Sequence, residues 1–325
     1  MVTHRVLITS HTFRRMAGDH QRRLIDAGCE LIVSPYPHAA TEDELLPLVA
    51  DVDAALASTD AFTRRVLAAA PRLRIISRFG VGFDSIDVAA ATDRGIWVTV
   101  TPGTNEHSVA DLTLALILAL ARQLVPVANQ TRAGAWERAL GVELRGQTLG
   151  LVGFGRIGRQ VALRARAFGV EVVVYDIVRD AAAAAQLGAR YVPLDELLAR
   201  ADFVSLHAPA TPETRHIIGA QALAQMKPTA CLVNTARGEL VDEADLAAAL
   251  RERRIAGAAL DVFKQEPPAA DHPLLGLPNV LVTPHIAGLT AQSGERMAAL
   301  SAENILAVLR GERPAHPVNE PRPRT

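Results

Sequence analysis

Cysteine is scarce in this chain, whose 325 residues include only Cys29 and Cys231. Neither has a cysteine or histidine partner at the spacing of a zinc motif, so we expect no disulfide framework and no structural metal site. Charge of one sign is not in excess either, because the net charge is −1. We interpret the one dense basic run, residues 251–254, as the solvated end of a helix, so no nucleic-acid-binding surface is predicted.

Long hydrophobic runs are missing as well. The most apolar segment, residues 112–121, is interrupted by Thr113 and bounded by Asp111 and Arg122. It is about half as long as the roughly 20 residues that span a bilayer, which predicts a buried helix and no membrane span. The apolar run near the N-terminus is too short for a signal peptide, and we therefore expect a cytoplasmic protein.

What the chain does contain is enough hydrophobic material for a sizeable core, 49% of its residues, and enough length for two domains. Strand-like apolar runs alternate with helix-like segments, which is typical of an α/β fold with parallel sheets. Expected strands are residues 5–8, 30–34, 54–57, 74–77, 149–152, 170–175, 203–206, 231–234, 256–262 and 280–282. Expected helices include residues 19–27, 159–168, 243–251 and 290–309, and Thr41 with Glu44 predicts a capping box at another helix start. The proline-rich tail is expected to be disordered beyond Asn319.

The most informative stretch is residues 148–176. An apolar run is followed by Gly153, Gly155 and Gly158, then by a helix-like segment and a second apolar run that ends in Asp176. This order of strand, glycine turn, helix, strand and acid is typical of a dinucleotide-binding unit. Taken without its flanks, the turn also fits a flavodoxin-like or methyltransferase domain.

Each position of the motif has a physical reason. Gly153 allows a tight turn off the strand, Gly155 lets a pyrophosphate approach the backbone, and Gly158 lets the helix pack close to the sheet. The N–H groups of Arg156 and Ile157, at the helix start, would face the phosphate charge. Asp176 would accept hydrogen bonds from ribose hydroxyls and repel a 2′-phosphate, which favours NAD over NADP.

Three polar residues stand where an expected core strand gives way to a loop: Arg237, Glu266 and His285. Reduction of a 2-oxo acid needs a proton donor for the carbonyl oxygen and a cation for the carboxylate. Histidine suits the first task and the planar fork of arginine the second, while a carboxylate beside the histidine favours its charged form. Each residue alone also fits an ordinary loop role, and sequence spacing does not show that the three meet.

Several segments together resemble the D-isomer-specific 2-hydroxyacid dehydrogenases, in particular their phosphoglycerate dehydrogenase-like branch. The resemblance covers nearly the whole chain. It rests on the glycine motif and on residues 79–87, 108–113, 205–209, 234–238, 259–263, 266–267 and 284–288.

The resemblance implies roles beyond what the residues show alone. It makes His285 the proton donor, Glu266 its hydrogen-bonded partner, and Arg237 the residue that binds the substrate and polarises its carbonyl. The N–H groups of Val81 and Gly82 would receive the substrate carboxylate. Residues expected around the cofactor NAD are Asp261, Thr235, Ala236 and Gly288 near the nicotinamide, and His207, Ala208 and Pro209 on the adenine side.

The resemblance also implies a discontinuous fold. A Rossmann-type NAD-binding domain, residues 101–288, would be inserted into a flavodoxin-like substrate domain made of residues 1–100 and 289–325. Family members are usually homodimers, joined here through a helix over residues 107–122.

Two features bear on the substrate. Phosphoglycerate-using members tend to have arginine where this chain has Ala57, whereas Arg78 and Arg138 match that branch and are candidate phosphate contacts. The expected substrate is therefore a small 2-hydroxy or 2-oxo acid, with 3-phosphoglycerate, hydroxypyruvate and glyoxylate as candidates. A non-catalytic NAD-sensing protein, like the corepressors that share this fold, is the alternative from a different class.

Overall fold

The computed structural model describes residues 3–16 and 19–323, which form two compact units. Unit 1 contains the described residues up to Asn105 and those from Leu289 onward, and unit 2 is Glu106–Gly288. The chain thus enters and leaves unit 2 once. The first boundary predicted from the sequence follows residue 100, and the compact units divide after residue 105.

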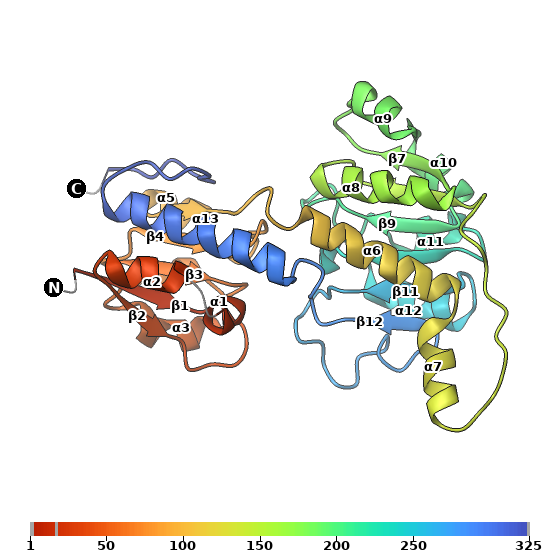
Figure 1. Cartoon of the computed structure of the whole chain (residues 1–325), viewed down its shortest axis with the longest axis horizontal. Helices are drawn as coiled ribbons and strands as arrows, with labels where there is room; N and C mark the ends of the chain where they lie inside the picture. The colour runs from red at the N-terminus through yellow and green to blue at the C-terminus, as the bar shows by residue number, and fades with distance from the viewer. Residues whose placement is uncertain (1–2, 17–18, 324–325) are drawn as a thin grey trace. The chain divides into compact units, whose positions relative to one another are not determined.

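In the described residues of unit 1, five parallel strands form one sheet in the order β2-β1-β3-β4-β5 (Figure 1). The strands are β1 (His4–Ile8), β2 (Cys29–Val33), β3 (Ala54–Ala57), β4 (Ile75–Arg78) and β5 (Trp97–Thr99). This is the strand order of flavodoxin-like folds, so the predicted fold of this unit is confirmed.

Helices cover both faces of that sheet. One face packs against α3 (Glu42–Val49), α4 (Arg64–Ala68) and α5 (Val88–Asp93). The other packs against α1 (His11–Arg15), α2 (Asp19–Asp26) and α13 (Ala291–Leu309). The predicted capping box is present, because the Glu44 carboxylate accepts the Thr41 N–H at 2.9 Å.

In unit 2, seven parallel strands of the described chain form a second sheet in the order β12-β11-β10-β9-β6-β7-β8. They are β6 (Thr148–Val152), β7 (Glu171–Tyr175), β8 (Ala189–Tyr191), β9 (Phe203–Leu206), β10 (Cys231–Asn234), β11 (Gly257–Leu260) and β12 (Val280–Val282). Starting from β8, the sheet reads as third, second, first, fourth, fifth and sixth strand of the unit, which is the Rossmann order, extended by β12.

This sheet is also covered on both faces. The first face carries α6 (Glu106–Ala121), α8 (Arg156–Ala165), the short η1 (Arg166–Phe168) and α9 (Ala181–Leu187). The second carries α10 (Leu194–Arg200), α11 (Ala220–Gln225), η2 (Gly238–Leu240) and α12 (Glu243–Arg251).

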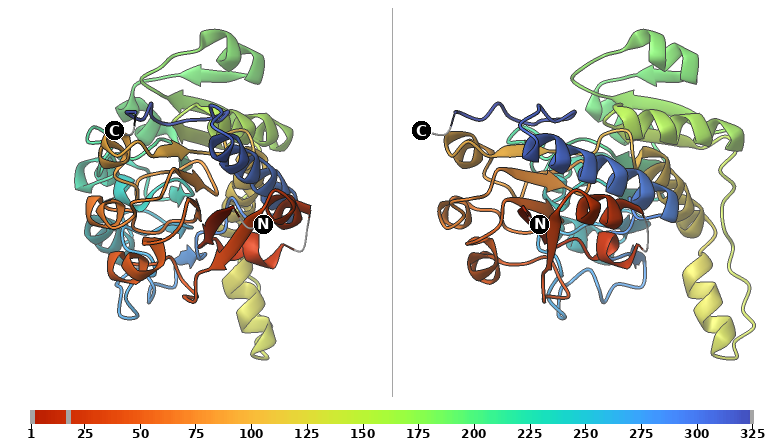
Figure 2. Two further views of the ribbon diagram at one scale, coloured as in Figure 1. Left: turned by 90° about the vertical axis from the view of Figure 1, so that its left-hand side faces the viewer. Right: turned by 60° about the vertical axis from the view of Figure 1, so that its left-hand side comes forward.

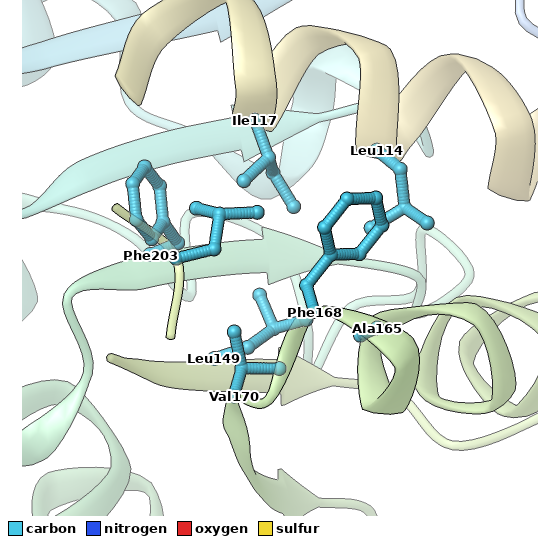
Figure 3. Close-up of a pocket in the computed structure, with 8 residues that line it drawn as sticks. Leu114, Ile117, Leu149, Ala165, Phe168, Val170 and Phe203 are labelled. Atoms are coloured by element: carbon cyan, nitrogen blue, oxygen red, sulfur yellow. The ribbon is translucent and has the colours of Figure 1, made fainter. Parts of the chain in front are cut away.

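The core under α6 is closely packed. Leu114, Ile117, Leu149 and Phe203 surround a void of only about 10 Å³ (Figure 3). An apolar void of that size stays dry, because a water molecule needs at least about 10–15 Å³ and polar partners. Residues 112–121 therefore serve as a buried core helix, as predicted, and no described helix alone is long and apolar enough to span a membrane.

Two parts of the chain differ from expectation or were not foreseen. None of the residues of α7 (Leu124–Arg132) is buried, and the helix stands away from the sheet of unit 2 (Figure 2). The predicted disorder beyond Asn319 is wrong as far as Arg322, whose N–H donates to the Thr92 carbonyl at 3.0 Å. Asn319 itself accepts the Val98 N–H at 2.8 Å, which fastens the tail beside β5.

Candidate functional site

Most of the predicted site residues of unit 2 lie along one edge of its sheet. Every strand there is parallel, so all carboxyl ends meet at the same edge, where α/β proteins bind ligands. In strand order, the residues that follow the carboxyl ends are His285 after β12, Asp261 after β11, Arg237 after β10, His207 after β9, Gly153 after β6 and Asp176 after β7.

The glycine turn has the geometry that the sequence predicts. Gly153 has a φ of +98°, and a Cβ there would lie 2.6 Å from the Ala208 backbone nitrogen. A Cβ on Gly158 would lie 2.3 Å from the carbonyl oxygen of Gly153, whereas a Cβ on Gly155 would meet nothing within 4 Å. The first and third glycines therefore permit backbone contacts within the protein, and the second leaves open space.

That open space borders the start of α8. As the first two residues of the helix, Arg156 and Ile157 have N–H groups with no helical carbonyl to receive them. These N–H groups and the helix dipole favour a negatively charged group, so the turn fits a pyrophosphate.

Asp176, directly after β7, lies next to the glycine turn. Its carboxylate accepts the Phe154 N–H at 2.6 Å and the Val178 N–H at 2.9 Å. The side chain is therefore fixed next to the glycine turn by the backbone on both sides. A carboxylate held there can accept hydrogen bonds from a ribose and repels a phosphate on it.

Asn234 and Gly238 shape the turn that carries Arg237. The Asn234 side chain accepts the Ala236 N–H at 3.0 Å and donates to the Arg237 carbonyl at 2.7 Å. A Cβ on Gly238 would lie 2.1 Å from the Phe263 carbonyl carbon and 2.2 Å from the Lys264 nitrogen. Only glycine lets the Arg237 turn pack directly on the segment that leads to Glu266.

The structure brings His285 and Glu266 together. The Nδ1 atom of His285 lies 2.7 Å from Oε2 of Glu266, whose Oε1 accepts the Phe263 N–H at 3.1 Å. If Nδ1–H donates to the carboxylate, the imidazole presents Nε2 to a ligand, and no described residue forms a hydrogen bond with that atom.

Asp261 holds the turn that presents His285. Its buried carboxylate accepts the hydroxyl of Thr283 at 2.6 Å and the N–H groups of Ile286 and Ala287 at 2.9 and 2.8 Å. Within this turn His285 has a φ of +53°, a left-handed conformation that is costly for a residue with a side chain. The three hydrogen bonds to Asp261 offset that strain.

Burial and hydrogen bonding act in opposite directions on the two carboxylates. Burial raises the pKa of Asp261 above its ordinary range, and the bonds from Thr283, Ile286 and Ala287 only partly counter this. Burial also acts to raise the pKa of Glu266, but His285, the Phe263 N–H and Arg237 together lower it. Because the pKa of Glu266 is lowered in the fold, these contacts add stability above its ordinary pKa, and that stability is lost as pH falls through the lowered value.

His207 is held as a neutral ring beside the glycine turn. Its Nε2 lies 2.9 Å from the Ser205 hydroxyl, and its buried Nδ1 has no hydrogen-bond partner among the described residues. Burial lowers the pKa of His207 to about 3, so it brings no positive charge to this part of the edge. Ala208 and Pro209 continue the same loop.

The other predicted residues of unit 2 have different surroundings. The Thr235 hydroxyl lies 3.0 Å from that of Thr113, which donates to the Val109 carbonyl, so Thr235 is tied to the core helix α6. Ala236 belongs to the Arg237 turn. Gly288 lies three residues after His285 and is the last residue of unit 2. Arg138 is exposed on the loop after α7, and the described contacts do not bring it to the other predicted residues of unit 2.

The predicted residues of unit 1 lie at the end of β4 and in the turn after it. Arg78 is buried, with 8% of its surface exposed, and its Nη1 donates to the Phe79 carbonyl. The N–H groups of Val81 and Gly82 donate to no other described residue. They are therefore available to an anion.

Sequence reasoning missed two residues that build the site, Asn234 and Gly238. Both stood within the segment that contains Arg237. Asn234 acts inside its own turn, on Ala236 and Arg237, whereas Gly238 lies against the backbone of Phe263 and Lys264, which is distant in sequence. Only the glycine directly after the arginine could have signalled a close approach of two backbones. The described residues hold no group of three or more His, Cys, Asp or Glu side chains arranged to bind a metal ion.

Comparisons with known proteins agree with this geometry. Residues 114–287 match a family model described as D-isomer specific 2-hydroxyacid dehydrogenase, NAD binding domain. The glyoxylate reductase of Korarchaeum cryptofilum is 47% identical over 283 residues, which cover 85% of each chain.

Two further matches extend over most of the chain. The D-3-phosphoglycerate dehydrogenase of Methanocaldococcus jannaschii is 46% identical over 86% of this chain, which spans 54% of that protein. The crystal structure of the TT0316 protein from Thermus thermophilus has a TM-score of 0.88 at 42% identity, covering 97% of this chain and all of the other.

The glycine geometry predicts different outcomes for two alanine variants. Gly158→Ala should lower both thermal stability and dinucleotide affinity, because its methyl group would push against the Gly153 carbonyl. Gly155→Ala should leave the melting temperature of the free protein nearly unchanged and weaken NADH binding by about tenfold or more, or roughly 1.4 kcal/mol.

Differential scanning fluorimetry without cofactor and titration of NADH fluorescence separate these effects. Equal losses of stability in the two variants would contradict the assignment of the open space at Gly155 to the dinucleotide.

Proposed function

Since the chain belongs to the D-isomer-specific 2-hydroxyacid dehydrogenase family, we propose that it interconverts a small 2-oxo acid and its D-2-hydroxy acid, with NADH and NAD as cofactor pair. The observation that carries this proposal is the 2.7 Å pair of His285 and Glu266, held on the same sheet edge as the glycine turn. A proton donor and a dinucleotide site on one edge are what this reaction requires.

Bound NADH supplies the hydride. The chain's own residues stabilise the developing charge and transfer the proton. His285 donates a proton from Nε2 to the carbonyl oxygen as negative charge develops there, and Glu266 stabilises the charged imidazole through Nδ1. In the direction of oxidation, the same imidazole accepts the hydroxyl proton.

Arg237 binds the substrate and polarises its carbonyl. It lies close enough to Glu266 to lower the pKa of that carboxyl group, and its Nη1 is held by the Ala236 carbonyl at 2.6 Å. The planar guanidinium can face a carboxylate with two parallel hydrogen bonds, which fixes the orientation of the 2-oxo acid.

Unit 1 supplies the substrate domain in this proposal. The N–H groups of Val81 and Gly82 after β4 receive the substrate carboxylate, supported by their lack of partners among the described residues. Unit 2 would hold NAD: Asp176 would accept hydrogen bonds from the ribose hydroxyls, residues 207–209 would lie on the adenine side, and Thr235, Ala236, Asp261 and Gly288 would lie near the nicotinamide.

We propose glyoxylate or hydroxypyruvate as the class of substrate. Ala57, the last residue of β3, supplies no cation itself, and the Korarchaeum relative, similar over 85% of its own length, is named glyoxylate reductase. The second candidate is 3-phosphohydroxypyruvate, which is favoured by the buried Arg78 and by the phosphoglycerate dehydrogenase relative.

A panel of substrates tests these alternatives. NADH oxidation by the purified protein is expected to be fastest with glyoxylate or hydroxypyruvate, slower with pyruvate and 3-phosphohydroxypyruvate, and weak with NADPH in place of NADH. A strong preference for the phosphorylated acid would favour the second candidate. NADH binding without turnover of any acid would instead support the NAD-sensing alternative.

His285→Ala is expected to lower kcat by about a hundred- to ten-thousandfold, because a positioned general acid is lost. Steady-state kinetics would be compared with those of His38→Ala, which removes an exposed histidine 3.1 Å from Glu44 and should be without effect. Unchanged turnover in His285→Ala would remove His285 from the proposed mechanism.

We also propose that the protein forms a homodimer. Exposed apolar side chains gather on α7 and the loop after it, where Trp136 and Leu140 are 85% and 93% exposed. The helix predicted for this role, α6, is largely buried within unit 2, so α7 and its loop offer the better surface for a second copy.

Sedimentation velocity would test the assembly. The wild type should sediment with the mass of a dimer, twice the 34.7 kDa of one chain. The double variant Trp136→Asp, Leu140→Asp should sediment as a monomer. The control is Leu163→Asp on α8, at a side chain 49% exposed, which should remain dimeric. A wild type that is monomeric at micromolar concentration would contradict the proposal.

A further inference from the structure

Besides His285 and Glu266, unit 2 contains a second histidine–carboxylate pair, formed by His272 between β11 and β12 and Glu243 at the start of α12. Nε2 of His272 is 3.2 Å from Oε2 of Glu243, and the two side chains are only 17% and 19% exposed. Nδ1 of His272 accepts the Leu274 N–H at 3.4 Å, so a neutral ring carries its proton on Nε2 and donates it to Glu243. The pair is therefore a directed hydrogen bond that does not depend on a charged histidine.

Glu243 uses both of its oxygens on one loop. Oε1 accepts the Lys264 N–H at 2.8 Å, and Oε2 accepts the His272 ring. Lys264 and His272 both lie in the segment that joins β11 to β12, so a single carboxylate joins two points eight positions apart in the sequence. Glu243 itself is the first residue of α12, whose start is capped by Asp242. The anchor of the loop is thus a fixed helix end.

Glu266 lies between the two fastened points. Its Oε1 accepts the N–H of Phe263, whose ring meets the ring of His272 edge-on at a centroid distance of 5.5 Å. The backbone of Phe263 and Lys264 also rests on Gly238, directly after Arg237. The loop that presents Glu266 is therefore held by α12 on one side and by the Arg237 turn on the other.

We propose that Glu243 and His272 are positioning residues, which hold residues 263–274 so that the Glu266 carboxylate meets His285. This inference rests on the proposed function. No hydrogen bond or ion pair joins Glu243 or His272 to Arg237, Glu266 or His285 within the described chain, so both act through the loop. Misplacement of a reacting group by about 1 Å can cost on the order of a hundredfold in rate, so a loosened loop lowers turnover.

Three variants separate the contacts. Glu243→Ala removes both anchors. Glu243→Gln keeps an oxygen for the Lys264 N–H. His272→Phe keeps a ring against Phe263 but removes the hydrogen bonds to Glu243 and Leu274. The control, Glu252→Ala, removes an exposed ion pair with Arg254, 2.9 Å long, at the other end of the same helix.

The measurements are kcat and KM for the 2-oxo acid and for NADH, with hydrogen exchange of residues 263–274 in the absence of ligand. Glu243→Ala is expected to lower kcat about tenfold or more and to speed exchange in this loop. Its KM for NADH should stay within about twofold, because β6 and β7 lie farther along the sheet. Glu243→Gln and His272→Phe should fall between Glu243→Ala and the wild type, and Glu252→Ala should match the wild type.

Two results would overturn the inference: unchanged kcat in Glu243→Ala, or a lower kcat without faster exchange in residues 263–274. If Glu243→Ala does not fold, the same two criteria apply to His272→Phe. A wild type that turns over no 2-oxo acid would contradict the proposed function instead, while the exchange measurement would still show whether Glu243 fastens the loop.

Discussion

The candidate site depends on the hydrogen bonds that the buried carboxylate of Asp261 accepts. It stands at the carboxyl end of β11 and binds the Thr283 hydroxyl and two N–H groups of the segment that leaves β12. These bonds fix His285 in a backbone conformation that it would not adopt by itself. Asp261, the residue that begins the segment with Glu266, therefore also holds the His285 turn, so the two side chains of the proposed proton-transfer pair share one support.

Two glycines, which have no side chain, have a comparable influence on the site. Gly153 and Gly238 each lie against the backbone of a neighbouring segment at distances that exclude a Cβ. The first contact joins the glycine turn to the His207 loop, and the second joins the Arg237 turn to the Glu266 loop. Close approach of backbones keeps these loops in one arrangement, since a backbone cannot change rotamer as a side chain can. The order of the proposed roles along the sheet edge, from proton transfer to phosphate and ribose binding, follows from strand order and from these contacts.

Much of the fold could be predicted from the sequence because its signals are local. The strands over residues 54–57, 203–206, 231–234 and 280–282 are found at their predicted bounds, where apolar runs end at polar or turn-forming residues. The resemblance supplied the pairing of Glu266 with His285. Neither source predicted the part of Asn234, Gly238 or Glu243. Gly238 and Glu243 act on chain far away in sequence. Asn234 holds the local Arg237 turn, but the sequence places it only as the last residue of a strand. The tail after Asn319 was judged from its prolines, whereas hydrogen bonds to Thr92 and Val98 decide its conformation.

The division of the chain bears on the order in which the protein can fold during synthesis. All strands of unit 2 are made before α13, so its sheet can be completed while α13 is not yet present. Unit 1 has all five of its described strands by Thr99, but one face packs against Met297, Ala302 and Ile305 of α13. The part of that face that α13 covers stays exposed until α13 has left the ribosome. During this interval the exposed apolar surface of unit 1 is open to aggregation, as is general for incompletely packed intermediates.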